Sequence, residues 1–361
     1  MKRKLFLIAL LLLAAVVALE IGLRVFFYQQ LKTRHFPLVY RPDSLYTYTY
    51  IPNATGYISV PDIEKKFRIN NYGHNAEDFT LAKDSSVFRI AVSGASNESG
   101  LWLNTNDDYV AVLNQLFKRH GHQVEVLNFS IDGRRTAGNF HYIKNFILQF
   151  KPDLILYKNP IPFAVLDKAR ENYGGYVISY NPTNNVSRKY NRALVDELNR
   201  NKLLTSVYDY SFIVRAICRH YLEHAENKGS EFYRYLSIYV EKHFFSEDVG
   251  WYEYTPEKST EELKELAAYT AARHAPLVLI TFGESAEEKQ MLTSAGLKLL
   301  DADLRARKFP RRLQFEHDGH WNEYGHSTVA NILYELLLES PLIPEKYKNR
   351  NARPAVVTAA Q

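Results

Sequence analysis

The sequence predicts an α/β protein: a three-layer α/β/α sandwich around a mainly parallel sheet, with a helical insertion and an N-terminal transmembrane helix. From residue 87 onward, short and continuously apolar runs recur along the chain, as is typical of strands buried on both faces. Between them, apolar residues are spaced three and four apart, as on one face of a helix. Strands that alternate with helices in this order favour a parallel sheet covered on both sides.

Five runs are predicted to be strands. They are VFRIAVSG (87–94), QVEVLNF (123–129), PDLILYK (152–158), PLVLITF (276–282) and a weaker LKLLDAD (297–303). Each is short enough for a single strand, and turn or helix signals follow each one.

Helices are expected between these strands. In the run 104–121, Asn106 is predicted to cap the helix, and Gly121 to end it. Further helices are expected over 136–150, after a capping box at Ser259–Glu262, over 286–296 and from Asn322 onward. The GES triplet at 283–285 imitates a serine motif, but it is interpreted as a helix start.

The domain boundaries follow from changes in this pattern. We expect a membrane anchor over 1–27, a stalk and lead-in segment over 28–87, the α/β domain over 88–343 and a disordered tail over 344–361. Within the domain, residues 160–258 lose the alternation and contain helical runs rich in Tyr, Arg and His, so they are interpreted as a helical insertion without a clear strand.

Composition excludes several functions. The net charge of +5 is small for 361 residues, and Lys and Arg are scattered, so binding of nucleic acid is not expected. The single cysteine, Cys218, rules out an internal disulfide framework and a cysteine-rich metal site. The 26 tyrosines would suit stacking on sugars, but packing under long loops is the favoured interpretation.

The N-terminus predicts a membrane location. The apolar stretch 5–27 is long enough to cross a bilayer, which takes about 20 residues. Lys2, Arg3 and Lys4 precede it and would hold the N-terminus in the cytoplasm, which leaves the rest of the chain outside. Glu20 and Arg24, four residues apart, can pair near the far interface. A cleaved signal peptide is the alternative. An uncleaved anchor is favoured because hydrophobicity resumes at Ile21 and no clean A-x-A site is present.

Three segments carry the residues that can do chemistry. Ligands of such sheets bind beyond the carboxyl ends of the strands, which is where GASNESG (94–100) and NFSIDGR (128–134) lie. The third segment, EHDGHWNEYGH (316–326), precedes the last helix. A serine nucleophile needs a base, and the base needs an orienting carboxylate. Asp318 and His320 can meet on one loop, with the other ring nitrogen of His320 facing Ser96.

This set resembles the SGNH (GDSL-type) hydrolase superfamily. Its first block, G-D-S-x-T-x-G, matches Gly94 to Gly100 with Ser96 as the serine. Gly133 fits the oxyanion-hole glycine of the second block, and DGHWN matches the last block. The two-residue spacing from Asp318 to His320 and the lead-in RINNYGHNAEDF, which precedes the first strand, resemble those of membrane-anchored bacterial members of the superfamily. The resemblance spans roughly residues 60–340. It implies a triad of Ser96, His320 and Asp318 and an oxyanion hole from the N–H groups of Ser96 and Gly133.

The chain departs from the family pattern in two places. Ala95 and Glu98 replace the aspartate and threonine of the first block. The third block should offer G-x-N-D, but the chain reads YKNPIPF, in which Asn159 is the only asparagine and falls about three residues early. Loss of an oxyanion donor costs about 100- to 1000-fold in turnover, so activity would weaken without disappearing.

The predicted function is that of a membrane-anchored serine esterase or O-acyltransferase acting on an acylated glycan or lipid of the cell envelope. It would reside in the bacterial inner membrane, with its domain periplasmic or extracellular, and would need no cofactor or metal. The alternative is an inactive envelope protein of the same fold that binds or organises glycans. A metal cluster of Glu316, His317, Asp318, His320 and His326 is disfavoured because its spacing matches no helical H-E-x-x-H pattern. His317 and His326 are expected to be structural.

Overall fold

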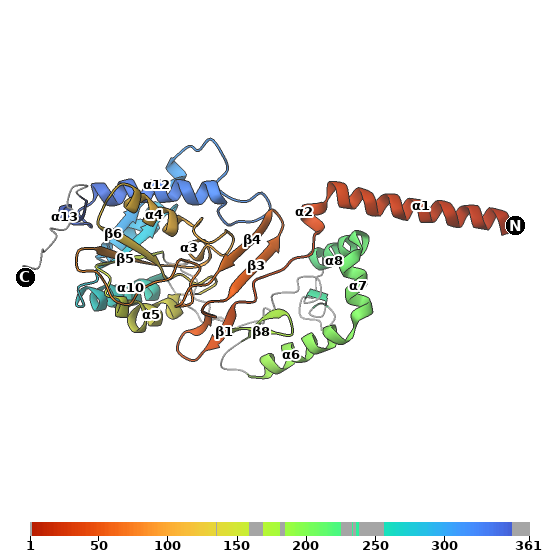
Figure 1. Ribbon diagram of the computed structural model, residues 1–361, viewed down its shortest axis with the longest axis horizontal. Coiled ribbons are helices and arrows are strands. Elements are labelled where there is room, and N and C mark those ends of the chain that lie inside the picture. Colours follow the sequence, from red (N-terminus) through yellow and green to blue (C-terminus); the bar gives the residue numbers. More distant parts are fainter. Residues whose placement is uncertain are drawn as a thin grey trace, which may run out of the picture.

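The computed structural model describes residues 2–134, 136–158, 169–180, 185–224, 233, 236–237 and 256–348. The predicted fold class is confirmed: five parallel strands form one sheet with helices on both faces (Figure 1). The strands are β5 (Phe88–Ser93), β6 (Val124–Asn128), β7 (Leu154–Tyr157), β10 (Leu277–Thr281) and β11 (Leu299–Asp301). Each lies inside a run predicted to be a strand.

The strand order has a topological switch point at β5. The order is β11-β10-β7-β5-β6, so the chain moves to one side of β5 for β6 and to the other side for β7. Loops that leave neighbouring strands in opposite directions open a crevice at such a switch point. The segments after β5, β6 and β7 therefore lie around one place.

Alternate residues of the strands enter two separate hydrophobic clusters. Ala91, Leu127 and Ile155 face a cluster that includes side chains of α5 (Thr136–Asn145) and α10 (Pro256–Ala271). Their neighbours Ile90, Val126 and Leu156 face a second cluster that includes α4 (Tyr109–Arg119) and α12 (Glu323–Glu339). Because strand side chains alternate between the two faces, strands with apolar residues at successive positions bury both faces, and the three layers follow.

The helix boundaries correct two predictions and confirm two. The N-cap of α4 is Asp108, whose carboxylate accepts hydrogen bonds from the N–H groups of Val110 and Ala111, so Asn106 was the wrong cap. An N-cap must directly precede the first helical residue to reach those groups. The helix expected after Ser259 begins earlier, at Pro256, because proline suits the first turn of a helix. As predicted, helices begin at the GES triplet and near Asn322: Ser285 caps α11 (Ala286–Ser294) and Asn322 caps α12.

The insertion contains helices and also a hairpin that was not predicted. Its described helices are α6 (Asn185–Arg200), α7 (Lys202–Tyr210) and α8 (Phe212–His224). The expectation of no strand was wrong, because β8 (Ala169–Tyr173) pairs antiparallel with β9 (Tyr176–Tyr180). Gly174 and Gly175 link them with positive φ angles of 56° and 87°, the backbone that a two-residue hairpin turn requires.

The segment 28–87, expected to be a stalk and lead-in, contains two hairpins. They comprise β1 (Tyr40–Asp43) with β2 (Thr47–Tyr50) and β3 (Thr55–Val60) with β4 (Ile63–Arg68). Tyr48 and Tyr50 are buried in the cluster that covers one face of the large sheet, which agrees with packing rather than sugar stacking as the role of these tyrosines. In the tail, α13 (Glu345–Lys348) is described; residues 349–361, called disordered, lie outside the described residues.

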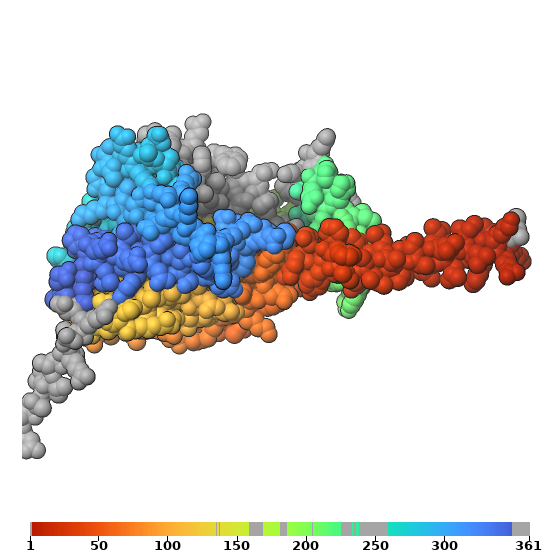
Figure 2. All heavy atoms as spheres, turned by 90° about the horizontal axis from the view of Figure 1, so that it is seen from above, coloured from red at the N-terminus to blue at the C-terminus, as the bar shows by residue number. Residues whose placement is uncertain are grey.

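The N-terminal helix α1 (Lys2–Phe26) extends away from the rest of the chain (Figures 1 and 2). Within the described residues it is the one helix long and apolar enough to cross a membrane, and a signal sequence would meet the same criterion. A short helix, α2 (Tyr28–Leu31), follows it.

Candidate active site

Ser96 begins a one-turn helix, α3 (Ser96–Ser99), directly beyond β5. A Cβ on Gly94 would lie 2.4 Å from Cγ of Glu98, so any larger residue would displace the Glu98 side chain from this turn. The Ser96 side chain is half-buried, and among the described residues its hydroxyl makes no hydrogen bond. The hydroxyls of the neighbouring serines are engaged: Ser93 bonds to Asn139 and Ser99 donates to the carbonyl of Ser96. Ser96 is thus the serine of this turn with an uncommitted hydroxyl.

His320 is oriented by Asp318. Oδ1 of Asp318 lies 2.5 Å from Nδ1 of His320 and also accepts the backbone N–H of His320 at 2.8 Å. Burial alone would raise the pKa of Asp318, but these hydrogen bonds and the imidazole charge bring it below its ordinary value. An ionised Asp318 fixes the proton on Nδ1, which leaves Nε2 as the acceptor. Within the described part of the chain, Nε2 has no hydrogen-bond partner.

Two further contacts hold this loop beside the serine turn. The indole of Trp102 stacks on the imidazole of His320, with ring centroids 3.9 Å apart and an interplanar angle of 20°. The N–H of Trp321 donates to the side-chain oxygen of Asn97 at 3.1 Å. Asn97 directly follows Ser96, and Trp321 directly follows His320, so one hydrogen bond ties together the two segments that carry the predicted nucleophile and base.

Gly133 lies in the turn after β6, against the side chain of Arg170 from β8. Its φ is +68°, and a Cβ there would lie 2.3 Å from Nη2 of Arg170. Arg170 pairs with Asp132 at 3.0 Å, and the same carboxylate accepts hydrogen bonds from the hydroxyls of Tyr40 and Tyr50. Burial, together with the charge of Asp132, raises the pKa of both tyrosines. Both hydroxyls therefore stay protonated as donors and fix this turn.

The backbone N–H groups of Ser96 and Gly133 donate no hydrogen bond to any described residue. Each follows a neighbouring parallel strand at the carboxyl edge. Unpaired backbone donors on adjacent turns are what an oxyanion hole requires.

Asn159, the candidate for a third oxyanion donor because it is the only asparagine of YKNPIPF, lies outside the described residues. The residue before it, Lys158, pairs with Glu284 at 2.5 Å. Lys158 also interacts with Glu98, the residue that replaces the threonine of the family block. Burial raises the pKa of Glu98, and the charges of Lys158 and His320 oppose this rise. Glu98 accepts the N–H of Ala95 and so closes the serine turn.

The remaining residues of the histidine segment make structural contacts. Nδ1 of His326 accepts the N–H of Tyr109 at 3.0 Å, and burial lowers the pKa of His326 to about 3, in agreement with the structural role predicted for it. His317 bonds to Asp62 at 2.7 Å. Ligand atoms of Glu316 and His317, which are exposed, come together with the half-buried Asp62, and not with His320. Such a group is common on protein surfaces without a metal.

Sequence reasoning missed Trp102, Asn97 and Arg170. Asn97 had a usable signal, because it stands next to the predicted nucleophile and its amide can bond to a neighbouring loop. Trp102 and Arg170 had none: one stacks on a residue more than two hundred positions away, and the other belongs to the unpredicted hairpin.

The sequence matches no family model, and no curated protein matches it. Solved structures are similar in fold. TesA has 13% identity and a TM-score of 0.38, and the match covers 71% of this chain and 99% of that chain. Esterase EstA from Pseudoalteromonas sp., inhibited by monoethylphosphonate, has 11% identity, a TM-score of 0.37 and coverage of 70% and 97%. A catalytic mutant of an acetylxylan esterase from Geobacillus stearothermophilus has 13% identity, a TM-score of 0.34 and coverage of 72% and 95%. At these identities the similarity is one of fold.

Proposed function

We propose that this chain is a serine esterase or O-acyltransferase that uses Ser96, His320 and Asp318. The observation that carries the proposal is the oriented imidazole: Asp318 holds Nδ1 of His320 at 2.5 Å, and the hydrogen bond from Trp321 to Asn97 ties its loop to the serine turn. An uncommitted serine hydroxyl and an uncommitted Nε2 near one strand edge are the components of nucleophilic acyl transfer.

In the first step, Oγ of Ser96 attacks the carbonyl carbon of an ester while Nε2 of His320 takes the hydroxyl proton. The negative charge that develops on the carbonyl oxygen is stabilised by the N–H groups of Ser96 and Gly133. Collapse of this intermediate breaks the bond to the alkoxy oxygen, which leaves as an alcohol with the proton from His320. The product is an acyl group on Ser96.

In the second step, His320 deprotonates the acceptor, which attacks the acyl-enzyme. Water as the acceptor gives the free acid, and a sugar hydroxyl gives a newly acylated glycan. In both cases the bond from the acyl carbon to Oγ of Ser96 breaks and His320 returns the proton to Oγ, which restores Ser96 without a metal or an organic cofactor.

The substrate proposed is an ester-bearing glycan or lipid of the cell envelope. The support is the predicted anchor: α1 is apolar and unburied, and Lys2, Arg3 and Lys4 stand at its N-terminus. This arrangement favours a single-pass protein of the bacterial inner membrane with its catalytic domain on the periplasmic or outer side.

A fluorophosphonate probe tests the nucleophile in the full chain, purified in detergent. We expect the wild type to be labelled, Ser96→Ala to be unlabelled, and the matched control Ser99→Ala to be labelled, because the Ser99 hydroxyl only bonds to a carbonyl. Equal labelling of wild type and Ser96→Ala would defeat the assignment.

Turnover of p-nitrophenyl acetate tests the base. We expect His320→Ala to abolish it and His317→Ala, which removes an exposed histidine of the same loop, to retain it. A wild-type protein that neither hydrolyses this ester nor reacts with the probe, yet binds envelope glycan, would favour the non-catalytic alternative.

A further inference from the structure

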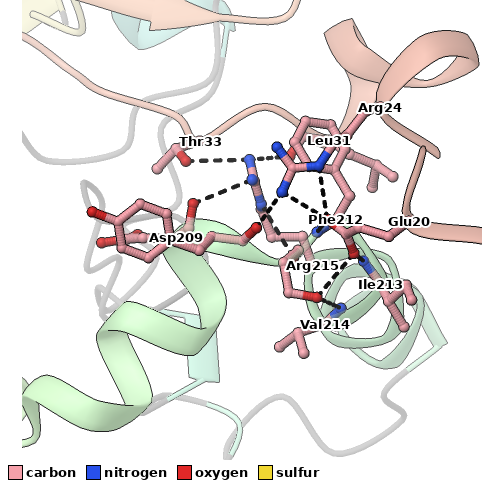
Figure 3. A network of polar contacts seen from close by, with 11 residues as sticks. Glu20, Arg24, Leu31, Thr33, Asp209, Phe212, Ile213, Val214 and Arg215 are labelled. Atoms are coloured by element: carbon pink, nitrogen blue, oxygen red, sulfur yellow. Dashed lines mark hydrogen bonds and ion pairs between the residues drawn. The ribbon is translucent and has the colours of Figure 1, made fainter. Parts of the chain in front are cut away.

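Glu20 of α1 caps the N-terminus of α8 in the helical insertion (Figure 3). Its carboxylate accepts the N–H groups of Phe212 and Ile213 at 2.8 and 3.1 Å and the hydroxyl of Ser211 at 3.1 Å. The first N–H groups of a helix have no partner within the helix, and its positive end attracts an anion. An acidic residue of the apolar N-terminal segment thus completes a helix almost 200 residues later.

Three arginines reinforce this contact between α1 and α8, which we call the joint; two of them, Arg24 and Arg215, are labelled in Figure 3. Arg24 pairs with Glu20 at 2.8 Å and donates to the carbonyl of Tyr210 at the end of α7. Arg215 and Arg219 of α8 turn inward and donate to the backbone carbonyls of Leu31 and Lys32, respectively. The joint therefore fastens α7 and α8 both to α1 and to the segment that leads from it. In Figure 1, α7 and α8 lie at the base of α1, with α8 next to α2. Figure 2 shows the same neighbours from above.

A signal peptide that is removed after translocation would take Glu20 and Arg24 with it. The N-terminus of α8 and the end of α7 would then lose their partners. The joint thus favours an α1 that stays attached to the mature protein.

The position of Glu20 along α1 indicates how close the joint comes to the bilayer. From Leu5 to Leu19 the chain is free of charge, and these fifteen residues span only about 22 Å as a helix. The hydrocarbon core of a bilayer is about 30 Å thick. If Lys4 marks the cytoplasmic boundary, Glu20 lies near the outer edge of the hydrocarbon, where a carboxylate is costly unless it is paired. Arg24 and the N–H groups of α8 supply that pairing, so the start of α8 must reach the lipid surface.

The exposed face of α7 and α8 suits that position. On α7, Leu203, Val207 and Tyr210 are 79%, 44% and 77% exposed and lie four and three residues apart. On α8, Ile217 and Tyr221 are 64% and 43% exposed and lie four apart. This spacing puts each set on one face of its helix. Large apolar side chains in contact with water are unfavourable, and tyrosine is enriched at membrane interfaces.

We propose that α7 and α8 form a lipid-binding surface which rests on the outer leaflet and is held there by the joint between Glu20 and α8 of an uncleaved α1. The partner is the bilayer itself, because the surface begins where the predicted membrane span ends. The insertion would then hold the α/β domain at a fixed height and orientation above the lipid. This inference rests on the proposed membrane anchor, and it is independent of the catalytic assignment.

The first test is the mass of the intact mature protein, isolated from membranes. We expect a chain that retains Glu20 and Arg24. A mature chain that begins after Arg24 would overturn the proposal, whether or not the protein hydrolyses p-nitrophenyl acetate.

The second test maps lipid contact in nanodiscs that hold one full-length chain. Nitroxide labels are placed at Leu203→Cys or Ile217→Cys in a Cys218→Ala background. The matched control is Glu197→Cys on α6, whose native side chain is exposed and polar. We expect labels at 203 and 217 to collide often with oxygen, which dissolves in lipid, and rarely with a nickel complex that stays in water. The label at 197 should collide with the nickel complex. Labels at 203 and 217 as open to nickel as the one at 197 would overturn the proposal. A second result would also overturn it: dipolar coupling between the labels of two chains in detergent, together with exposure of the same labels to nickel in nanodiscs. That result would identify a second copy of the chain, and not the bilayer, as the partner of this surface.

The third test breaks the joint alone. Glu20→Gln keeps the shape of the side chain but removes its charge, and Glu197→Gln is the control on the exposed surface. We expect faster trypsin cleavage at Arg215 and Arg219 in Glu20→Gln and no change in Glu197→Gln. Cleavage at the wild-type rate in Glu20→Gln would show that the carboxylate does not hold α8, and would overturn the joint.

Discussion

Trp102 stacks on the imidazole of His320 with ring centroids 3.9 Å apart. The indole covers one face of the ring, and Asp318 holds its Nδ1 edge, so two contacts from different segments set the direction of Nε2. Nothing else among the described residues bonds to that nitrogen. Trp102 is therefore a positioning residue for the proposed base.

We expect Trp102→Ala to lower kcat for p-nitrophenyl acetate by about 10- to 100-fold, because a base displaced by about 1 Å can lose that much. KM should change little. Trp102→Phe retains an aromatic face and should recover most of the rate. Equal losses in both variants, or a loss confined to KM, would contradict a positioning role.

Asp318→Asn should leave the fold intact and lower kcat by about 1,000- to 10,000-fold, because an amide cannot hold the imidazole with its proton on Nδ1. The wild type should retain an ionised Asp318 in mildly acidic solution, since its pKa lies below the ordinary value. Thermal unfolding in detergent serves as the control for folding. A variant with near wild-type turnover would exclude Asp318 as the orienting group.

The fold could be predicted from the sequence where the signal is local and repetitive. The runs that became β5, β6, β7 and β10 are short and mainly apolar, and burial on both faces leaves few other structures for them. The hairpin of residues 40–50 was missed because its tyrosines mix apolar rings with polar hydroxyls. In the structure, Tyr48 and Tyr50 are buried while their hydroxyls bond to the Asp132 turn.

In the candidate site, too, local contacts could be predicted from the sequence and contacts between distant segments could not. The hydrogen bond between Asp318 and His320 could be predicted because the residues are two apart on one loop. The contact of Arg170 with Gly133 could not, because it depends on a hairpin from the insertion folding back against the turn after β6. A family block fixes residue types in order along the chain, and it carries no information about such neighbours.

Gly133→Ala should be strongly destabilising and should lower activity. The residue would be strained at φ +68°, and its Cβ would lie 2.3 Å from the guanidinium of Arg170. Gly175→Ala is the matched control, because Gly175 also has a positive φ, +87°, but a Cβ there meets nothing within 4 Å. Urea unfolding and turnover should show a larger stability loss for Gly133→Ala and an activity loss confined to it. Equal effects would mean that backbone strain, and not the contact with Arg170, explains the result.

Asp108 should make the protein less stable as the pH rises. Burial raises the pKa of Asp108 to about 7, although the N–H groups of Ala111 and Val110 and the amide of Asn128 oppose the rise. Between pH 4 and pH 7 the folded state therefore keeps a proton that the unfolded chain releases. This contribution is complete below the ordinary aspartate pKa and is lost as the pH climbs through 7.

Asp108→Asn tests this directly, because asparagine is also a good N-cap and does not titrate. We expect the free energy of unfolding of the variant, minus that of the wild type, to be larger at pH 8 than at pH 5, because only the wild type loses stability over this range. Urea unfolding of the full chain in detergent measures both values. Burial lowers the pKa of His326 and of His74 to about 3. The stability that these two histidines contribute to the folded protein therefore changes in the opposite direction and is lost as the pH falls below 6.5. Their contribution is common to both proteins and cancels in the comparison. A difference between variant and wild type that is the same at both pH values would mean that Asp108 is already ionised at pH 5 in the folded protein.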